Sequence, residues 1–437
     1  MQTLKLTKKY EKYPEYKDSG VEWFGKVPKD WQVGPLRSVL VERVEKNKKL
    51  VTDNILSVMK DVGVIRYADK GDVGNKSSDR PENYKIVHAG DIVLNSMNLV
   101  IGSVGQSKEL GVTSSVYIIY YPRNKEIFAD YYHYLFRNKS WQKTLGRLGK
   151  GIMELRESIN SDLLKIEPVP IPPFNQQKAI VAFLDKKTSY IDRIIENKQK
   201  LIELLREKRT SVINNAVTIG LTQKVELVES GIAWIGKMPK GWRLDKIKRV
   251  ALINKKTLSE NTNPNFSFKY FDIGSVDEEE VSNVESEITF EKAPSRARRI
   301  VSVGDSIIAT VRTYLKAIAY FDKLDTDTVA STGFAVLTPK KELIPKYLFY
   351  YLQSDRFINQ VIIKSKGIGY PAITPFDLGS LEIIYPDKNI QQSIVTYLDE
   401  SVNKYNSIIE KAEKSINLLS EFKSSLISSV VTGKIKV

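Results

Sequence analysis

Some segments of the chain carry residue types that could do chemistry, but they lack the pattern that the chemistry needs. Residues 71–78 contain the glycines, lysine and serines of a phosphate-binding loop. They lack the Gly-x-x-x-x-Gly-Lys-Ser/Thr spacing that wraps backbone amides around phosphates. Asp387 with Glu421 and Lys423 would supply charged groups for a metal-dependent nuclease, but Glu421 and Lys423 fall on an expected amphipathic helix. We interpret both sets as solvated surface.

Another segment, Ile171-Pro172-Pro173-Phe174, is similar to the Asn/Asp-Pro-Pro-Tyr/Phe signature of amino-methyltransferases. The first side chain of that signature accepts a hydrogen bond from the target amine, which isoleucine cannot do. The chain has no cysteine and only two histidines, His88 and His133, which excludes cysteine nucleophiles, cysteine-ligated zinc and iron–sulfur clusters. We therefore expect no catalytic, cofactor-binding or metal site here and interpret the chain as a binding protein.

The charge balance favours a polyanionic partner. The 437 residues include 67 Lys and Arg against 52 Asp and Glu, a net charge of +15. Counted along the sequence, residues 1–219 carry +11 and residues 220–437 carry +4. A positive field attracts nucleic acid, although it also keeps proteins soluble. The length is sufficient for two to four domains.

The chain is a tandem duplication. The 13 residues from Ser19 to Trp31 match those from Ser230 to Trp242 without a gap, at an offset of 211. Further matches follow in the same order: Gly90-Asp91 with Gly304-Asp305, Asn175-Gln176-Gln177 with Ile390-Gln391-Gln392, and Phe183-Leu184-Asp185 with Tyr397-Leu398-Asp399. A period this long indicates one pair of domain-sized units rather than a solenoid.

Each repeat divides into a strand-rich part and a long helix, which predicts an α+β fold. Short β-branched and aromatic runs bounded by Gly and Pro are typical of strands. Prolines at 168–173 and at 386 end the strand-rich parts. The predicted boundaries are 1–172 and 221–388 for the strand-rich domains, and 173–220 and 389–437 for the helices.

Apolar residues in both helical segments recur at spacings of three and four, as in the seam of a coiled coil. Each helix of about 40 residues would be roughly 60 Å long. We expect the two helices to pair with each other; the alternative is that each packs on its own globular domain. The predicted seam residues are Leu184, Ile191, Ile194, Leu201, Leu205, Val212, Leu398, Tyr405, Ile409, Ile416, Leu419 and Leu426.

Basic and aromatic side chains gather at matching places in the two strand-rich parts, in a pattern that suits DNA contacts or a merely solvated surface. The loops after the two Gly-Asp pairs differ although their frame agrees, so the two copies are expected to read different halves of a bipartite target. Asn suits adenine and Arg suits guanine. The candidate DNA-binding residues are Asn95, Ser96, Asn98, Arg137, Lys143, Arg147, Lys150, Arg296, Arg298, Arg299, Arg312, Thr313, Tyr314, Lys316, Lys364, Lys366 and Tyr370.

The whole chain resembles the specificity subunit (S, HsdS) of type I restriction–modification systems. The resemblance rests on the Ser-Gly-x-x-Trp-x-Gly-x-x-Pro-x-x-Trp openings at 19–31 and 230–242, on the two Gly-Asp turns, and on the proline-to-Gln-Gln segments at 173–177 and 386–392. The family often has Glu-Gln where this chain has Gln-Gln, a departure that we expect to have no functional consequence.

The resemblance implies two target recognition domains, with the two helices paired as an antiparallel coiled coil of pseudo-twofold symmetry that sets the spacer of a bipartite, asymmetric double-stranded DNA target. It also implies two adenine-N6 methyltransferase (M) subunits, which carry S-adenosylmethionine and dock on the helices. Restriction–translocase (R) subunits that use ATP and Mg are expected to join them. The chain itself would then need no cofactor and would not be an enzyme.

Two other interpretations remain open from the sequence: a non-catalytic coiled-coil scaffold with an incidental basic surface, and an enzyme with unrecognised catalytic residues. The apolar runs are well short of the ~20 residues of a membrane span. The start, Met1-Gln2-Thr3-Leu4-Lys5, has no apolar core like that of a signal peptide. With the resemblance, these features predict a soluble protein of the prokaryotic cytoplasm that does not contact the membrane.

Overall fold

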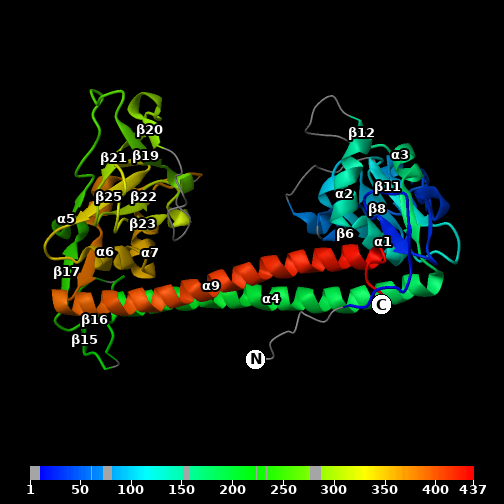
Figure 1. The fold of residues 1–437 in the computed structure, drawn as a ribbon. Coiled ribbons are helices and arrows are strands. Elements are labelled where there is room, and N and C mark those ends of the chain that lie inside the picture. Colours follow the sequence, from blue (N-terminus) through cyan, green and yellow to red (C-terminus); the bar gives the residue numbers. More distant parts are fainter. Residues whose placement is uncertain are drawn as a thin grey trace. The chain divides into compact units, whose positions relative to one another are not determined.

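The computed structural model describes residues 10–60, 62–71, 81–150, 158–222, 224–232, 234–275, 287–367 and 369–437. The chain forms two compact units. Unit 1 comprises residues 1–198 together with 414–437, and unit 2 comprises residues 199–413. Figure 1 shows the elements of both units, coloured along the sequence. Because unit 1 takes residues from both ends of the chain, its fold depends on segments far apart in the sequence.

A four-stranded antiparallel sheet forms the centre of unit 1, with the strand order β4 (Leu40–Glu42), β11 (Tyr117–Pro122), β8 (Ile92–Asn95) and β9 (Val104–Gln106). Side chains alternate between its faces, as strand geometry requires. Ile92, Leu94, Ile118 and Tyr120 enter the main core, while Val93 and Ile119 enter a smaller cluster on the other face. Both faces are therefore buried.

The remaining elements of unit 1 cover this sheet. Tyr131 and Tyr132 of α1 and Trp141 of α2 are fully buried in the main core. The helices are α1 (Ala129–Phe136), α2 (Lys139–Leu145) and α3 (Ser161–Ile166), with 3₁₀ helices η1 (Leu36–Ser38), η2 (Tyr67–Lys70), η3 (Pro81–Asn83), η4 (Leu99–Ile101) and η5 (Gly146–Leu148). The paired strands are β1 (Tyr16–Asp18) with β2 (Lys26–Pro28), β3 (Gln32–Pro35) with β14 (Pro168–Ile171), β5 (Leu56–Met59) with β6 (Gly63–Arg66), β7 (Lys85–Val87) with β10 (Gly111–Thr113), and β12 (Gly149–Lys150) with β13 (Ser158–Ile159).

Unit 2 repeats the central sheet in the order β18 (Ala251–Ile253), β25 (Phe334–Pro339), β22 (Ser306–Ala309) and β23 (Ile318–Tyr320). A second four-stranded sheet has the order β20 (Glu287–Thr289), β19 (Ser267–Phe271), β24 (Thr328–Ser331) and β21 (Ala297–Val301). Smaller pairs are β15 (Leu227–Glu229) with β16 (Lys237–Pro239) and β17 (Arg243–Lys246) with β26 (Glu382–Tyr385). The helices are α5 (Ile247–Val250), α6 (Pro345–Leu352), α7 (Asp355–Lys364) and α8 (Pro375–Ser380), with η6 (Ile273–Ser275), η7 (Phe290–Lys292) and η8 (Thr313–Leu315). The predicted duplication and α+β fold are confirmed.

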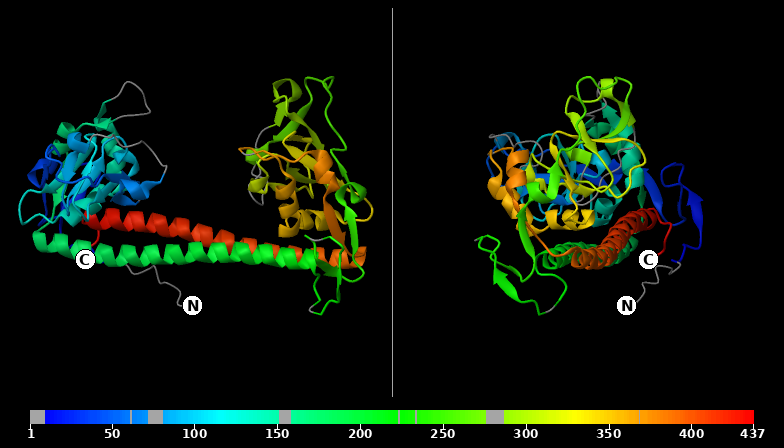
Figure 2. Two further views of the ribbon diagram at one scale, coloured as in Figure 1. Left: turned by 180° about the vertical axis from the view of Figure 1, so that it is seen from behind. Right: turned by 90° about the vertical axis from the view of Figure 1, so that its left-hand side faces the viewer.

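Two long helices, α4 (Phe174–Thr218) and α9 (Lys388–Val431), pack together in both units. In unit 1, Leu184 shares a core with Leu426 and Val430, and Lys423 Nζ lies 2.6 Å from Asp192. In unit 2, Arg206 pairs with Glu413 and Arg209 donates to Asn406, so α9 runs backward as α4 runs forward. Within each unit the two helices are therefore antiparallel, as the left view of Figure 2 also shows.

One predicted seam position is wrong. Leu201 is 43% exposed, and its neighbour Ile202, 7% exposed, is buried in its place. The helical period explains the shift, because steps of three and four residues from Ile191 lead through positions 194, 198, 202 and 205. The structure buries Leu184, Ile191, Leu398, Ile409, Leu419 and Leu426, and half-buries Ile194, Leu205, Val212, Tyr405 and Ile416.

A buried glutamine fastens the start of each long helix to its strand-rich part. Gln177 accepts from the Phe128 backbone N–H and donates to the carbonyls of Glu126 and Pro172. Gln391 makes the equivalent bonds to Ile344, Glu342 and Pro386. Gln177 is therefore equivalent to Gln391, and the sequence match that placed Gln176 opposite Gln391 is displaced by one residue.

Candidate nucleic-acid interface

The differing loops after the two Gly-Asp pairs each form a short 3₁₀ turn at an equivalent place, although the turns begin differently: Asn98 has φ −125° and Arg312 has φ +52°. In unit 1 Asn98 precedes η4 and Gly102 ends it; in unit 2 Arg312 precedes η8 and Lys316 ends it. Gly102 has φ +97° and Lys316 has φ +51°, so both turns close in the left-handed region. At this offset of 214, Asn98 is equivalent to Arg312. The place of the turn and its left-handed close are thus retained, while its first residue changes in both side chain and backbone conformation.

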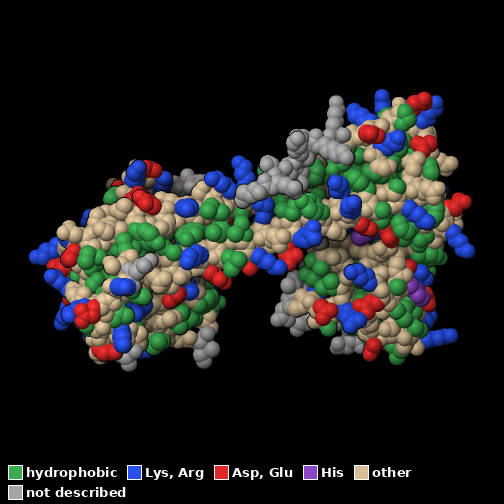
Figure 3. Space-filling view, turned by 90° about the horizontal axis from the view of Figure 1, so that it is seen from below, with side chains coloured by type: hydrophobic (Ala, Val, Ile, Leu, Met, Phe, Trp, Pro, Cys, Tyr) green, Lys and Arg blue, Asp and Glu red, His purple; other side chains and the backbone are tan. Residues whose placement is uncertain are grey.

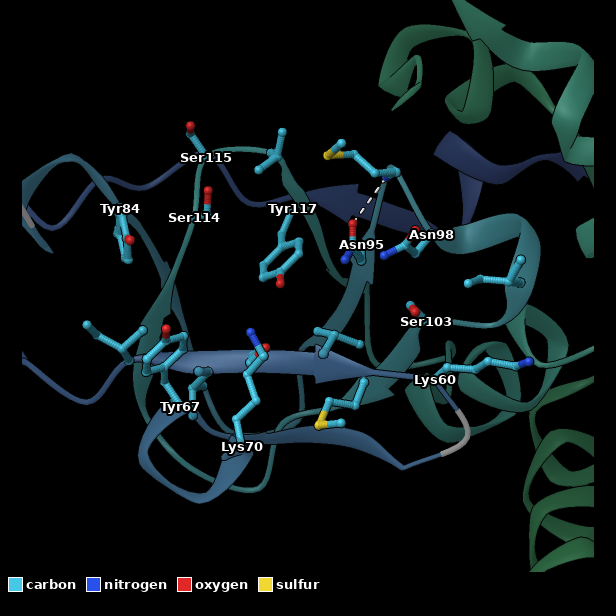
Figure 4. A pocket seen from close by; sticks show the side chains of 18 of the residues that line it. Lys60, Tyr67, Lys70, Tyr84, Asn95, Asn98, Ser103, Ser114, Ser115 and Tyr117 are labelled. Atoms are coloured by element: carbon cyan, nitrogen blue, oxygen red, sulfur yellow. Dashed lines mark hydrogen bonds between the residues drawn. The ribbon is translucent and has the colours of Figure 1, made fainter. Parts of the chain in front are cut away.

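The turn of unit 1 borders a cavity of about 630 Å³. Figure 4 shows Tyr67, Lys70 and Tyr117 converging on it from different strands and turns, with Asn95 and Asn98 along one wall. The side-chain oxygen of Asn95 accepts from the Met97 N–H at 3.1 Å, whereas Asn98 is exposed. Aromatic rings, amides and an ammonium group around one hollow are suited to stacking on bases and to hydrogen bonding with their edges.

Ser96 does not belong to the exposed surface of this turn. It is 3% exposed, donates to the Val116 carbonyl at 2.7 Å and contacts Ser158. Thr313 is buried in the same way in unit 2, with its hydroxyl 2.9 Å from that of Ser365. Both hydroxyls form hydrogen bonds within the protein. These two predicted contact residues therefore hold the turns in place and do not face a ligand.

The structure brings the other candidates of the second turn together. Val311 and Lys366 both form a β-bridge with Ala372, which brings Lys366 and Ala372 close to the start of η8. The Arg312 guanidinium lies over the Tyr370 ring, 4.9 Å from its centroid. Tyr314, Lys316, Lys364, Lys366 and Tyr370 are exposed around this pair. Three lysines, one arginine and two tyrosines therefore form one surface of unit 2.

The basic residues of β21 and its approach are more constrained. Arg296 is exposed but hydrogen-bonds to the Tyr270 hydroxyl and Asp272. Arg298 lies over the Phe290 ring at 5.0 Å and donates to the Ala297 carbonyl. Arg299 is half-buried and donates to Thr257. Internal partners thus engage all three side chains.

The basic candidates of unit 1 do not form one cluster. Arg137 is half-buried over the Tyr134 ring, and Lys143 is exposed on α2. Arg147 forms an ion pair at 2.6 Å with Glu167, a buried carboxylate. Lys150 ends β12, and its side chain lies outside the described part of the chain. Figure 3 likewise shows Lys and Arg interspersed with Asp and Glu on the face that it presents.

Sequence reasoning missed Lys60, Tyr67 and Lys70 of the unit 1 cavity. The predicted clusters are basic runs without acidic residues, whereas in this stretch of the sequence Asp61 and Asp69 stand among the lysines. The β5–β6 hairpin and the η2 turn after it bring Lys60 and Lys70 to the cavity. Alternation of Lys with Tyr around the hairpin was the available indication.

The two histidines lie in different surroundings. Burial beside Arg137 lowers the pKa of His133 to about 3, so its imidazole stays neutral at physiological pH. His88 lies 3.1 Å from Glu45 on an exposed edge. Within the described ranges, no group of three His, Asp or Glu side chains is arranged to hold a metal ion. In the same ranges, no helix is both long and apolar enough to cross a bilayer.

Lys316 offers a test of the second turn. A side chain with a Cβ is disfavoured at φ +51°, where the equivalent residue is Gly102. Lys316→Gly is expected to raise the free energy of unfolding by about 1 kcal/mol, measured by urea denaturation. Leu315→Gly, one residue earlier, is the control, because glycine in a helical turn should lower stability by about 1 kcal/mol. A loss in both variants would contradict the strain at position 316.

Two copies of one strand-rich part, each followed by a long helix, define a tandemly duplicated protein. The family model described as type I restriction modification DNA specificity domain matches residues 28–204 and again 239–418. The chain belongs to this family.

Individual relatives agree with this assignment. A putative type I restriction enzyme MjaX specificity subunit of Methanocaldococcus jannaschii is 22% identical over 438 residues, which cover 94% of this chain and 95% of that protein. The HindI specificity subunit of Haemophilus influenzae is 28% identical over 141 residues, 31% of this chain and 29% of that protein. A solved chain of a type I R-M system has a TM-score of 0.70 at 15% identity, covering 93% of this chain and 98% of its own length. The HsdS subunit of Thermoanaerobacter tengcongensis has a TM-score of 0.50 at 14% identity, with 94% and 98% covered.

Proposed function

We propose that this chain is the DNA-binding specificity subunit of a type I restriction–modification complex, and that each unit reads one half of a bipartite, asymmetric target. The observation that carries the proposal is the pair of turns at Asn98 and Arg312, which follow equivalent strands but present different side chains on different backbone conformations. Exposed lysines beside the second turn are suited to phosphates, which fix position without specifying sequence. Two DNA-binding units in one chain are suited to a target split into two half-sites rather than to one continuous sequence.

The proposal assigns catalysis to partner subunits. The chain would contribute recognition domains at 1–172 and 221–388 and spacer helices at 173–220 and 389–437. Two M subunits would dock on the helices and transfer methyl groups from S-adenosylmethionine to adenine N6. R subunits would supply ATP- and Mg-dependent cleavage. The chain itself would carry no cofactor and would act on DNA in the prokaryotic cytoplasm.

The test is to sequence methyladenine in the host genome with and without the gene for this chain. We expect one split motif to lose methylation when the gene is deleted and to regain it when the gene is restored on a plasmid. The control is a catalytically inactive M subunit, which should remove the same motif. A methylation pattern that does not depend on this chain would contradict the proposal, and methyl transfer by the purified chain alone would show that it is itself an enzyme.

A further inference from the structure

We propose that Arg312 reads a guanine in the major groove of the second half-site and that Tyr370 is the residue that positions its guanidinium. This inference rests on the proposed function and goes further by naming the base and the pair of side chains that select it. Arginine presents two parallel N–H donors, which match the O6 and N7 acceptors of guanine. An arginine can read guanine in this way only if its N–H donors are not already engaged within the protein.

Arg312 differs from the other arginine candidates in its partners and its exposure. Arg147 and Arg296 are paired with carboxylates, Arg298 donates to a backbone carbonyl and Arg299 donates to Thr257. Arg137 also lies over a tyrosine ring, but it is half-buried. Arg312 is exposed; in the part of the chain that the structure describes, its side chain contacts the Tyr370 ring and forms no hydrogen bond or ion pair. Its N–H donors therefore remain free for a ligand.

The backbone of this turn is strained at both ends. Arg312 has φ +52° and Lys316 has φ +51°. Among the described non-glycine residues, only Leu50 and Asn254 share a positive φ. Non-glycine residues in this conformation cost free energy and are typical of sites where the side chain is needed for function. The first unit closes its turn with Gly102, so the frame itself does not require a lysine there.

The turn is rigidly supported beneath these side chains. Thr313 bonds to Ser365, and the Ile373 N–H donates to the Thr310 carbonyl at 2.8 Å. Lys316, Lys364 and Lys366 are exposed around it as flexible point charges suited to phosphates. The Arg312 backbone is thus held by hydrogen bonds of the turn, and the neighbouring lysines would hold the DNA backbone close to the Arg312 side chain.

Tyr370 is 68% exposed, and the Arg312 guanidinium lies over its ring. Stacking fixes the plane of the guanidinium and leaves its edge free, which lowers the cost of ordering it against a base. Because the ring itself need not contact DNA for this effect, Phe should replace Tyr at position 370 and Leu should not.

The experiment uses the chain in complex with its M subunits. The probes are DNA duplexes that carry the split motif found by methyladenine sequencing, with each base pair of the second half-site replaced in turn. For Arg312→Lys and Arg312→Ala, we expect the preference for guanine at one position to fall about tenfold or more. Preferences in the first half-site should stay unchanged. Tyr370→Leu should give the same selective loss, and Tyr370→Phe should keep the preference.

Lys364→Ala is the matched control: it should lower methylation of all duplexes about equally and reduce the salt dependence of binding. An equal loss on all duplexes for Arg312→Ala would overturn the inference, because it would mark Arg312 as a phosphate contact. Unchanged base preferences would also overturn it, as would equal effects of Tyr370→Leu and Tyr370→Phe. These results are distinct from failure of the proposed function, in which the wild-type complex would methylate no split motif.

Discussion

Gln391→Leu is expected to lower the free energy of unfolding of unit 2 by about 3 kcal/mol. Gln391 has no exposed surface and makes three hydrogen bonds, to the Ile344 N–H and to the carbonyls of Glu342 and Pro386. Leucine has a similar size but removes all three, and each lost bond costs about 1 kcal/mol where the remaining partner is shielded from water. The measurement is urea denaturation of the chain, followed by circular dichroism.

The adjacent Gln392 provides the control, because it is exposed and lies on the other side of the same helix turn. Gln392→Leu should change stability by less than about 0.5 kcal/mol. Gln177→Leu should repeat the large loss in unit 1, where Gln177 makes the equivalent bonds. If Gln391→Leu and Gln392→Leu had the same effect, the proposed role of the buried amide would be wrong.

Lengthening both long helices by seven residues is expected to increase the preferred spacer between half-sites by about three base pairs. This prediction rests on the proposed function. Seven residues make two helical turns, about 10 Å, and keep each seam facing its partner. The insertions belong after Lys198 in α4 and after Glu413 in α9, where each helix passes from one unit to the other. Methylation of duplexes with graded spacers measures the preference.

The contrasting variant inserts seven residues into α4 alone. It should disturb the pairing of Arg206 with Glu413 and of Asp192 with Lys423, because the two helices would then differ in length. We expect this variant to lose methylation at every spacer rather than to shift its preference. An unchanged spacer preference in the double insertion would exclude the helices as the ruler.

The sequence predicted those features that depend on repeated local patterns. The duplication, the strand-rich parts and the seam from Leu398 to Leu426 follow from spacing alone, since a helical period is visible without knowing what it packs against. Leu201 failed because one additional apolar residue, Ile202, made two phases of the pattern nearly equal. Which of Leu201 and Ile202 is buried depends on where the partner helix lies, and the sequence pattern of one helix does not contain that information.

The candidate interface was less predictable because polar residues do not indicate whether they are buried. Ser96 and Asn98 look alike as loop residues, yet Ser96 is internally bonded and Asn98 is exposed. Thr313 and Arg312 differ in the same way. The stacking of Arg312 on Tyr370 spans 58 positions of sequence and depends on the bridge between Val311 and Ala372. Such contacts arise only once the fold has formed.

Unit 1 is built from two segments, residues 1–198 and 414–437, and this determines when during synthesis its core can be completed. Leu426, Ile427, Val430 and Val431 belong to the same core as Trp31 and Tyr131, and the Tyr131 hydroxyl donates to the Val431 carbonyl. Unit 2 is continuous from 199 to 413, so the ribosome delivers all of it before those last residues appear. Domains generally fold as they emerge, N-terminal first. The strand-rich part of unit 1, although it is made first, must therefore wait for residues 426–431 before its core is complete, and a stop codon before position 426 would leave that core exposed.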